Sequence, residues 1–178
     1  MIKKLGVLIG FVLTLIFVVP LFLPSQFEVD RVIFISKPRA DVYSKIVDLG
    51  DWNDWSPWYQ MEPQARFEFQ GTPGVVGSQS LWKGERIGEG SQTLTRVVDR
   101  EYIETKLEFK KPSPSQAIAY FRFVEQDDGT LVTWGMKGDL PYPLGRWLGL
   151  FFKQRLGSQL QEGLDRLKTL LETSDTNL

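Results

Sequence analysis

The sequence predicts an α+β domain in which a seven-stranded antiparallel sheet wraps around one long C-terminal helix, with a transmembrane helix before the domain. Three observations support this prediction. Residues 5–24 carry no charge at all, and apolar residues recur at every second position from residue 66 to 138. From residue 145 to 172 the apolar period changes to that of a helix, so one long helix follows the strands.

Composition narrows the chemistry before any motif is considered. The chain has 178 residues, which suits a single domain with an appendage. It has no cysteine and no histidine, which excludes disulfides, thiolate or imidazole metal sites, cysteine nucleophiles and a Ser-His-Asp triad. A net charge of −1 gives no electrostatic footprint for nucleic acid. We therefore expect no nucleic-acid partner, no metal and no cofactor.

The first 25 residues are predicted to anchor the chain in a membrane. As a helix, residues 5–23 would extend about 28 Å, close to the roughly 30 Å hydrocarbon core of a bilayer. Lys3 and Lys4 precede this run, and Glu28 and Asp30 follow it. The positive-inside rule then predicts a single-pass protein of the cell membrane with a cytoplasmic N-terminus and a periplasmic, or more generally extracytoplasmic, domain.

Two alternatives remain for this segment. A cleaved leader would need small residues before the cleavage point, and cleavage after Ser25 would put Leu23 three residues before it, which favours an uncleaved anchor. Gly6 and Gly10 form a G-x-x-x-G pair that could support a weak homodimer. Glycine is also common in membrane helices that do not associate.

The domain begins with one strand and one short helix. Residues 27–35 are rich in β-branched and aromatic side chains and predict a strand. Ser36 could cap a helix with Pro38 in its first turn, and this helix should end near Gly50. The following DWNDWSPWYQ stretch, residues 51–60, is too aromatic and too interrupted to predict a regular element.

Six further strands are predicted between the short helix and the C-terminal helix. In the clearest of them, Ile103, Thr105, Leu107 and Phe109 point one way and charged residues point the other, which is typical of an antiparallel sheet with one solvated face. The six expected strands cover residues 66–70, 78–83, 90–99, 102–110, 115–126 and 130–137.

We place the domain at residues 26–173 and expect a disordered tail at 174–178. The domain ends with one long helix. Its apolar stripe begins with Leu148 and Phe152 and continues with leucines to Leu171. This helix is the only predicted element large enough to cover the apolar face of the sheet. A curved sheet around one helix leaves a cleft between them, where a ligand would bind.

Several motifs occur in an order that resembles a known superfamily. They are Trp-Asn-Asp-Trp-Ser-Pro-Trp at 52–58, Trp-Lys-Gly at 82–84 with Gly-Glu-Gly at 88–90, Gly-Thr-Leu-Val-Thr-Trp at 129–134, and Glu-Gly-Leu with Leu-Lys between 162 and 168. Together they resemble the SRPBCC (START/Bet v 1-like) superfamily, in its polyketide cyclase/dehydrase-like bacterial branch with an N-terminal membrane anchor. The resemblance implies a helix-grip fold whose cavity binds hydrophobic small molecules, lipids or polycyclic compounds, and it does not imply catalysis.

The candidate ligand-binding residues are apolar or aromatic and are expected on the inner face of the sheet or on the terminal helix. The alternative is that these side chains only fill the core. The aromatic cluster of Trp52, Trp55, Trp58 and Tyr59 has three possible roles: the mouth or floor of the cavity, a membrane-interface belt, or a plug for the end of the sheet. The predicted lining is Trp58, Trp82, Leu107, Phe109, Phe121, Trp134, Met136, Leu156 and Leu160.

No catalytic residue is predicted, because the carboxylates after the first helix and around residues 85–89 lack an apolar context that would raise a pKa. Strand parity places Arg122 on the outer face. The leading hypothesis is a membrane-anchored domain that binds a hydrophobic small molecule or lipid between sheet and helix. The alternatives are a cyclase-type enzyme using a tyrosine or carboxylate, and a structural or interaction domain with a filled core.

Overall fold

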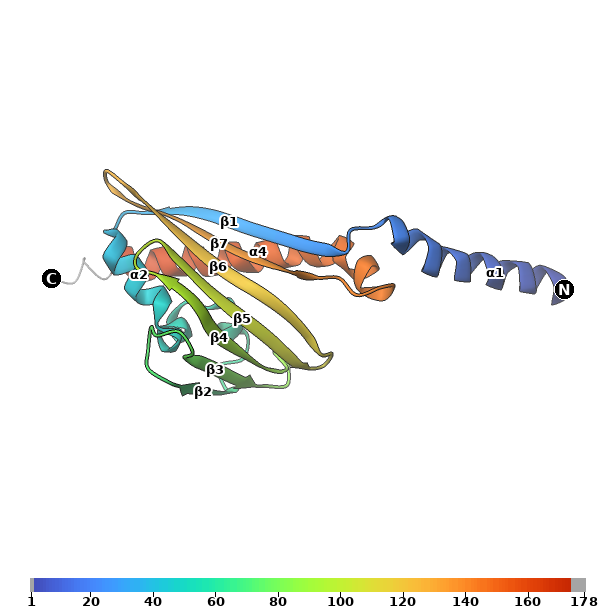
Figure 1. The fold of residues 1–178 in the computed structure, drawn as a ribbon, viewed down its shortest axis with the longest axis horizontal. Helices are drawn as coiled ribbons and strands as arrows, with labels where there is room; N and C mark the ends of the chain where they lie inside the picture. Colours follow the sequence, from blue (N-terminus) through green and yellow to red (C-terminus); the bar gives the residue numbers. More distant parts are fainter. Residues whose placement is uncertain (1, 174–178) are drawn as a thin grey trace.

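The computed structural model describes residues 2–173, without the side chains of residues 2, 3, 5 and 7–9, so the tail predicted at 174–178 lies outside the described residues. The chain forms an elongated domain with one helix projecting from its end (Figure 1). In chain order the elements are α1 (Ile2–Val18), the 3-10 helix η1 (Val19–Phe22), β1 (Gln26–Ile35), α2 (Arg39–Val47), the 3-10 helix η2 (Leu49–Asp54), α3 (Pro57–Met61), β2 (Arg66–Gln70), β3 (Gln79–Lys83), β4 (Glu89–Val98), β5 (Tyr102–Lys111), β6 (Ser115–Gln126), β7 (Gly129–Asp139) and α4 (Leu144–Thr173).

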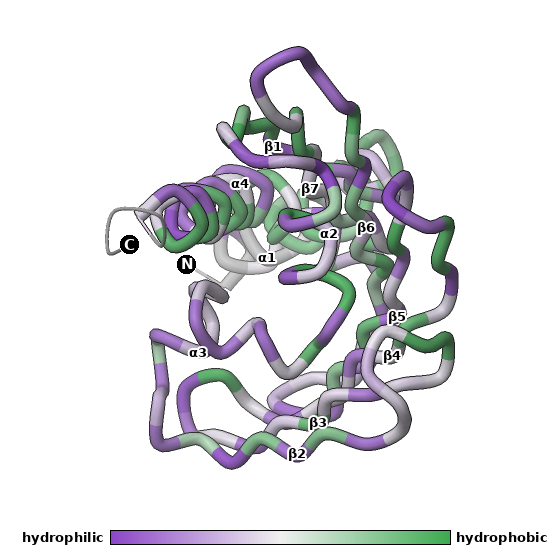
Figure 2. Tube along the Cα trace, turned by 90° about the vertical axis from the view of Figure 1, so that its left-hand side faces the viewer, coloured by the Kyte–Doolittle hydropathy of each residue, from purple (hydrophilic) through white to green (hydrophobic). Residues whose placement is uncertain are grey.

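The seven strands form one antiparallel sheet in the order β1-β7-β6-β5-β4-β3-β2. Figure 2 looks along the molecule and shows this sheet curving from β1 to β2, with α4 and α3 on its concave side. The predicted α+β fold with a seven-stranded antiparallel sheet and a long C-terminal helix is confirmed. The curvature follows from the twist of antiparallel strands, increased by a bulge in β4 between Leu94 and Arg96.

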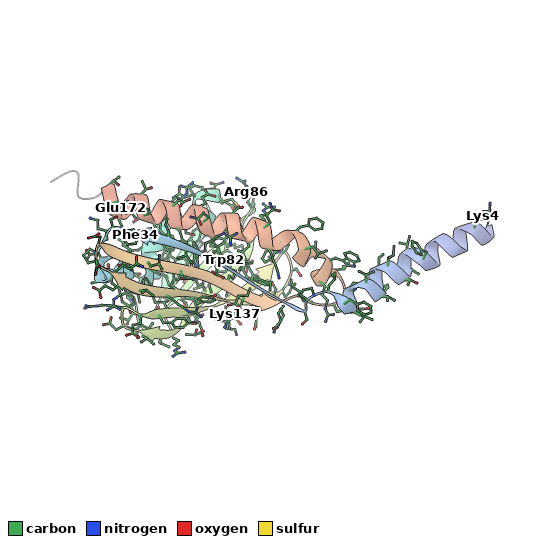
Figure 3. The ribbon with its side chains drawn as sticks, turned by 90° about the horizontal axis from the view of Figure 1, so that it is seen from above. Lys4, Phe34, Trp82, Arg86, Lys137 and Glu172 are labelled. Carbon is green, nitrogen blue, oxygen red and sulfur yellow. The ribbon has the colours of Figure 1, made fainter. Side chains whose placement is uncertain are left out.

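The long helix α4 is held against the sheet by an apolar stripe and by polar contacts at its C-terminal end. Near that end, Lys168 donates from Nζ to the carbonyl oxygen of Phe34 at 2.9 Å, and Glu172 accepts from the backbone N–H of Ser36 at 2.8 Å. Phe34 and Glu172 lie at the end of the domain farthest from α1 (Figure 3). The buried part of the stripe is Leu156, Leu160, Leu164, Leu167 and Leu171.

Two local predictions on the segment after β1 were wrong. Ser36 does not cap α2: the helix starts at Arg39 after Pro38, with no side-chain cap, and the N–H of Ser36 bonds to Glu172 instead. The aromatic stretch is not irregular, because it forms η2 and α3. The indole N–H groups of Trp52 and Trp55 donate to the carbonyls of Ile46 and Lys45, which the end of α2 leaves without helical partners, and so fold this segment back on α2.

The N-terminal helix is shorter than the apolar run that predicted it. The α-helix ends at Val18 and continues as the tighter η1, because Pro20 lacks an N–H and disfavours α geometry in the residue before it. Across residues 2–173, no helix has both the length and the apolar character needed to cross a membrane. The transmembrane helix is therefore not confirmed.

Candidate ligand-binding cavity

A cavity of about 190 Å³ lies between α4, the η2–α3 segment and the inner face of strands β2–β7. The sheet contributes alternate residues, since only every second side chain of a strand faces inward. The lining consists of Leu49, Trp52, Asn53, Ser56, Trp58, Tyr59, Phe67, Ser80, Trp82, Ile87, Gln92, Leu107, Phe109, Ala119, Trp134, Met136, Phe152, Leu156 and Gln159.

Most of the predicted lining residues meet at this cavity. Seven of the nine form part of its wall: Trp58, Trp82, Leu107, Phe109, Trp134, Met136 and Leu156. Phe121 and Leu160 do not line it, although both are buried in the core beside it. The ring of Phe121 stacks on Trp134 with centroids 5.1 Å apart, so it supports the wall from behind. That the seven contact a ligand stays a prediction.

The wall on the side of β3 depends on a glycine opposite a tryptophan. Gly90 pairs with Trp82 across β3 and β4, and a Cβ at Gly90 would lie 2.4 Å from the Trp82 ring and 2.5 Å from the carbonyl oxygen of Glu108. The absence of a side chain there lets the indole lie over the backbone of β4. The Trp82 ring then meets Phe109 edge-to-face at 5.7 Å, and the two rings form a continuous aromatic wall. Figure 3 shows Trp82 beneath α4.

The opposite wall comes from α4, through Phe152, Leu156 and Gln159, at helical spacing. Phe152 packs edge-to-face against Phe27 of β1 with centroids 5.1 Å apart. Its side chain is nevertheless 41% exposed, whereas Leu156, one turn further along, is buried. Phe152 therefore lies at the rim of the cavity and Leu156 in its interior.

An aromatic cluster closes the cavity on the side of α2. Trp52, Trp55, Phe121 and Trp134 pack with ring centroids between 4.8 and 6.2 Å apart, mostly edge-to-face. Trp55 is fully buried and Trp52 almost so, which excludes the membrane-interface alternative for these two rings. Trp58 and Tyr59 lie on the cavity wall. The cluster thus closes the end of the sheet and also forms the floor of the cavity.

The polar groups of the lining are neutral. Asn53, Ser56, Ser80, Gln92 and Gln159 contribute amides and hydroxyls, and the buried Nε2 of Gln92 donates to Thr105 Oγ1 at 3.0 Å. Among the lining side chains of the described chain there is no Asp, Glu, Lys or Arg, and Tyr59 is the one titratable group. The arrangement suits an uncharged, mostly apolar molecule with a few hydrogen-bonding atoms.

One buried carboxylate lies behind the rim without entering the cavity. Glu62 follows α3 and is 3% exposed. It accepts hydrogen bonds from the backbone N–H groups of Glu85, Arg86 and Ile87 at 2.8–3.1 Å, and these bonds hold its pKa below the ordinary value. Because Ile87 is part of the lining, Glu62 fixes the β3–β4 turn as one edge of the cavity.

The outer face of the sheet carries a polar network unrelated to the cavity. Tyr120 donates to Glu28 Oε1 at 2.9 Å, and burial together with this bond raises the pKa of Tyr120 to about 12. Its ring lies over Gly135, where a Cβ would approach within 2.2 Å. Arg122 is exposed on the same face beside the Tyr120 ring, which confirms its predicted outward orientation. The strongly perturbed tyrosine is thus structural.

Two wider depressions, of about 940 and 610 Å³, lie on the molecular surface and not between sheet and helix. One runs along the solvent side of α4 beside Arg31, and the other crosses the outer face of the sheet near Lys106. Both are bordered mainly by charged and polar side chains. The mostly apolar cavity between sheet and helix is the better candidate site, since ligand pockets are usually concave and mostly apolar.

Sequence reasoning missed several wall residues. Phe152 belongs to the same stripe as Leu156, so its place on the wall follows from a pattern already visible in the sequence. Gln92 and Ser80 were not predicted, because only apolar and aromatic residues were considered as lining. The two residues pair directly across β3 and β4. Phe67 comes from a short edge strand, and Ile87 from a turn whose path depends on Glu62.

The comparisons with known proteins agree with this architecture. A family described as "Polyketide cyclase / dehydrase and lipid transport" matches residues 26–172. A search of curated proteins gives no match. Many solved structures share the fold, at low sequence identity.

Three of these structures illustrate the likeness. Protein MLL2253 from Mesorhizobium loti is 13% identical with a TM-score of 0.62, over 83% of this chain and 98% of its own. Protein SA2116 from Staphylococcus aureus is 16% identical with a TM-score of 0.64, over 85% and 96%. The di-domain ARO/CYC protein StfQ from the steffimycin biosynthetic pathway is 10% identical with a TM-score of 0.63, over 85% of this chain and 52% of its own. With its domain matched almost end to end by the family, the chain belongs to the polyketide cyclase/dehydrase and lipid transport family.

Proposed function

We propose that the protein binds one uncharged, hydrophobic small molecule or lipid in the cavity between sheet and α4, and that residues 1–25 hold the domain at a membrane. The observation that carries the binding proposal is the cavity itself: a partly open space between sheet and α4 with aromatic walls and no charged side chain in its described lining. The family description, which names both cyclases and lipid transport, supports the same class of ligand.

The character of the lining limits the ligand. Burying a charge without a partner costs several kcal/mol, and the wall offers no partner of opposite sign. An apolar body would gain roughly 25 cal/mol for each Å² removed from water. Ser80, Gln92 and Gln159 could bond to a hydroxyl, carbonyl or ester group. These properties favour a neutral lipid or a weakly polar ring compound over a fatty-acid anion.

A catalytic role has weaker support. Acid–base chemistry needs a titratable group that reaches the substrate. Tyr59 is the one such group on the described wall, and its ring packs against Phe67 with centroids 4.1 Å apart. The carboxylate alternative is disfavoured, because the buried Glu62 is engaged with three backbone N–H groups. A filled core is disfavoured by the cavity volume of about 190 Å³.

Native mass spectrometry of the full chain, released from detergent, tests the binding proposal. We expect an apolar adduct at one per chain, displaced by the neutral probe N-phenyl-1-naphthylamine. Ala119→Leu places a larger side chain in the lining and should reduce probe affinity at least tenfold. Leu160→Met is the matched control, since it is buried, conserves volume and lies outside the lining. Absence of an adduct together with no saturable probe binding would reject the proposal.

Membrane attachment is supported by the uncharged run at 5–24 and by the lysines before it. We place the N-terminus in the cytoplasm and the domain in the periplasm, by the positive-inside rule. The cysteine-free sequence allows a direct topology test with Asp127→Cys, in the exposed β6–β7 turn. A membrane-impermeant maleimide should label this variant in intact cells, and labelling only after lysis would place the domain on the other side.

A further inference from the structure

The first turns of α4 expose an unusual amount of apolar surface. Leu144, Leu148 and Phe151 recur at helical spacing and point away from the sheet, with Phe151 78% exposed. Further along the same outward face, Arg155, Ser158 and Glu162 occupy the equivalent positions. The solvent side of a single helix therefore changes from apolar to polar within about two turns, near Arg155.

This apolar surface is continuous with the N-terminal segment. In η1, Leu21 and Phe22 are exposed, Phe22 to 84%, and α1 exposes apolar side chains from Phe11 to Val18. Three side chains at the start of α4 join the two parts. Tyr142 Oη donates to the carbonyl of Phe17 at 2.6 Å, Arg146 Nη1 to that of Pro20 at 2.8 Å, and Trp147 Nε1 to that of Ile16 at 3.3 Å.

The type of these joining residues indicates what covers the surface. Tyrosine and tryptophan, with an apolar body and a polar tip, are enriched where a protein meets the headgroup region of a bilayer. Here their polar tips bond to carbonyl oxygens in the last turn of α1, where the α-helical hydrogen-bond pattern ends.

Along α4 itself, the charges beside this surface are of one sign. From residue 144 to 161 of α4 there are three basic residues, Arg146, Lys153 and Arg155, and the first acidic residue is Glu162. Lysine and arginine stems can lie along apolar surface while their charged ends reach lipid phosphates. Basic residues close to an anionic membrane are attracted to its negative surface potential.

We propose that Leu144, Leu148, Phe151, Leu21 and Phe22 form a docking face that inserts into the surface of an anionic bilayer. Phe152 belongs both to the rim of the cavity and to this part of α4, so docking would bring the cavity rim beside the lipid. The ligand would then pass between bilayer and cavity without crossing bulk water. This inference rests on the proposed membrane attachment and adds a second contact to it.

Single-cysteine variants of the full chain test the docking face in vesicles of phosphatidylcholine and phosphatidylglycerol. Each variant carries an environment-sensitive fluorophore, and a doxyl-labelled lipid serves as quencher. Phe151→Cys should be quenched strongly, at least threefold more than the matched control Glu162→Cys, which lies on the same helix face about 16 Å further along. Quenching at Phe151 should weaken in vesicles of phosphatidylcholine alone. Equal quenching in the two kinds of vesicle would show that the basic residues do not contribute, and would overturn the preference for an anionic bilayer.

A third reporter separates this inference from the attachment on which it rests. Leu13→Cys lies in α1, where its side chain is exposed. Quenching at Leu13 without quenching at Phe151 would overturn the docking face and leave the anchor intact. No quenching at either position would overturn the anchor itself. Efficient bismaleimide crosslinking between Phe151→Cys chains at high lipid-to-protein ratio would show that a second copy covers the face, and would also overturn the proposal.

Discussion

The two ends of α4 use the same kind of residue for opposite purposes. At the end farthest from α1, Leu164, Leu167 and Leu171 are buried against the sheet, and Lys168 and Glu172 bond to the chain at the end of β1. At the end beside α1, the apolar side chains of the outward face stay uncovered. Figure 3 shows α4 running between these two environments.

The difference shows that an apolar stripe alone does not define a core. Burial depends on whether another element lies opposite the side chain, and no described element covers the outward face of α4 at its α1 end. The cavity occupies the region between the two ends. We therefore expect the packed end to determine stability, and the open end to affect binding and membrane contact while contributing little to stability.

A substitution at the packed end should cause the largest loss of stability. Leu164→Ala removes a fully buried side chain and leaves a void, which should lower the free energy of unfolding by about 2–5 kcal/mol. Urea denaturation followed by tryptophan fluorescence measures this loss in the full chain. Loss of less than about 0.5 kcal/mol would mean that this end is loosely packed and that the comparison between the ends fails.

A smaller loss of stability is expected at the edge of the cavity. The hydrogen bonds from Glu85, Arg86 and Ile87 hold the pKa of Glu62 below its ordinary value, so they stabilise the fold fully above the unfolded pKa of about 4.5. This contribution should be lost as the pH falls through the lower, folded pKa. Thermal unfolding of the wild type should therefore show a drop in Tm on acidification.

Glu62→Gln is the matched variant for this pH dependence. It keeps one carbonyl oxygen as an acceptor but has no carboxylate to titrate, so its Tm at pH 7 should be lower and its dependence on acid pH weaker than in the wild type. The variant should also weaken probe binding, because Ile87 lines the cavity. An acid-induced drop in Tm as steep as that of the wild type would mean that other carboxylates cause it.

Much of the fold follows from sequence periodicity. The strand at 102–110 alternates apolar and charged residues, and the structure has β5 there with the expected face buried. The cap predicted at Ser36 was wrong for a reason that the sequence could not show: its N–H bonds to Glu172, which is 136 residues away in the chain. The helical form of the aromatic stretch likewise depends on indole bonds to the end of α2. Such contacts exist only after the chain has folded.

The residues of the site could be predicted where strand alternation turns their side chains toward the inner face of the sheet. Trp82, Phe109 and Trp134 lie on strands whose alternation assigns them to the inner face, and all three line the cavity. Phe121 has the same parity but stacks behind Trp134, since parity gives the direction of a side chain and not its distance from the space. The role of Glu62 has no sequence signal, because it depends on a turn that approaches it from about 25 residues away.

The smallest change in stability is predicted at the open end, and it separates surface from core most directly. Phe151→Ser replaces an exposed apolar side chain, so the free energy of unfolding in detergent should change by no more than about 0.5 kcal/mol. In the full chain, the same substitution should weaken the contact of the domain with the vesicle surface, because it removes apolar area that would insert there. A loss comparable to that of Leu164→Ala would show that Phe151 is packed within the protein, and both ends of α4 would then belong to one core.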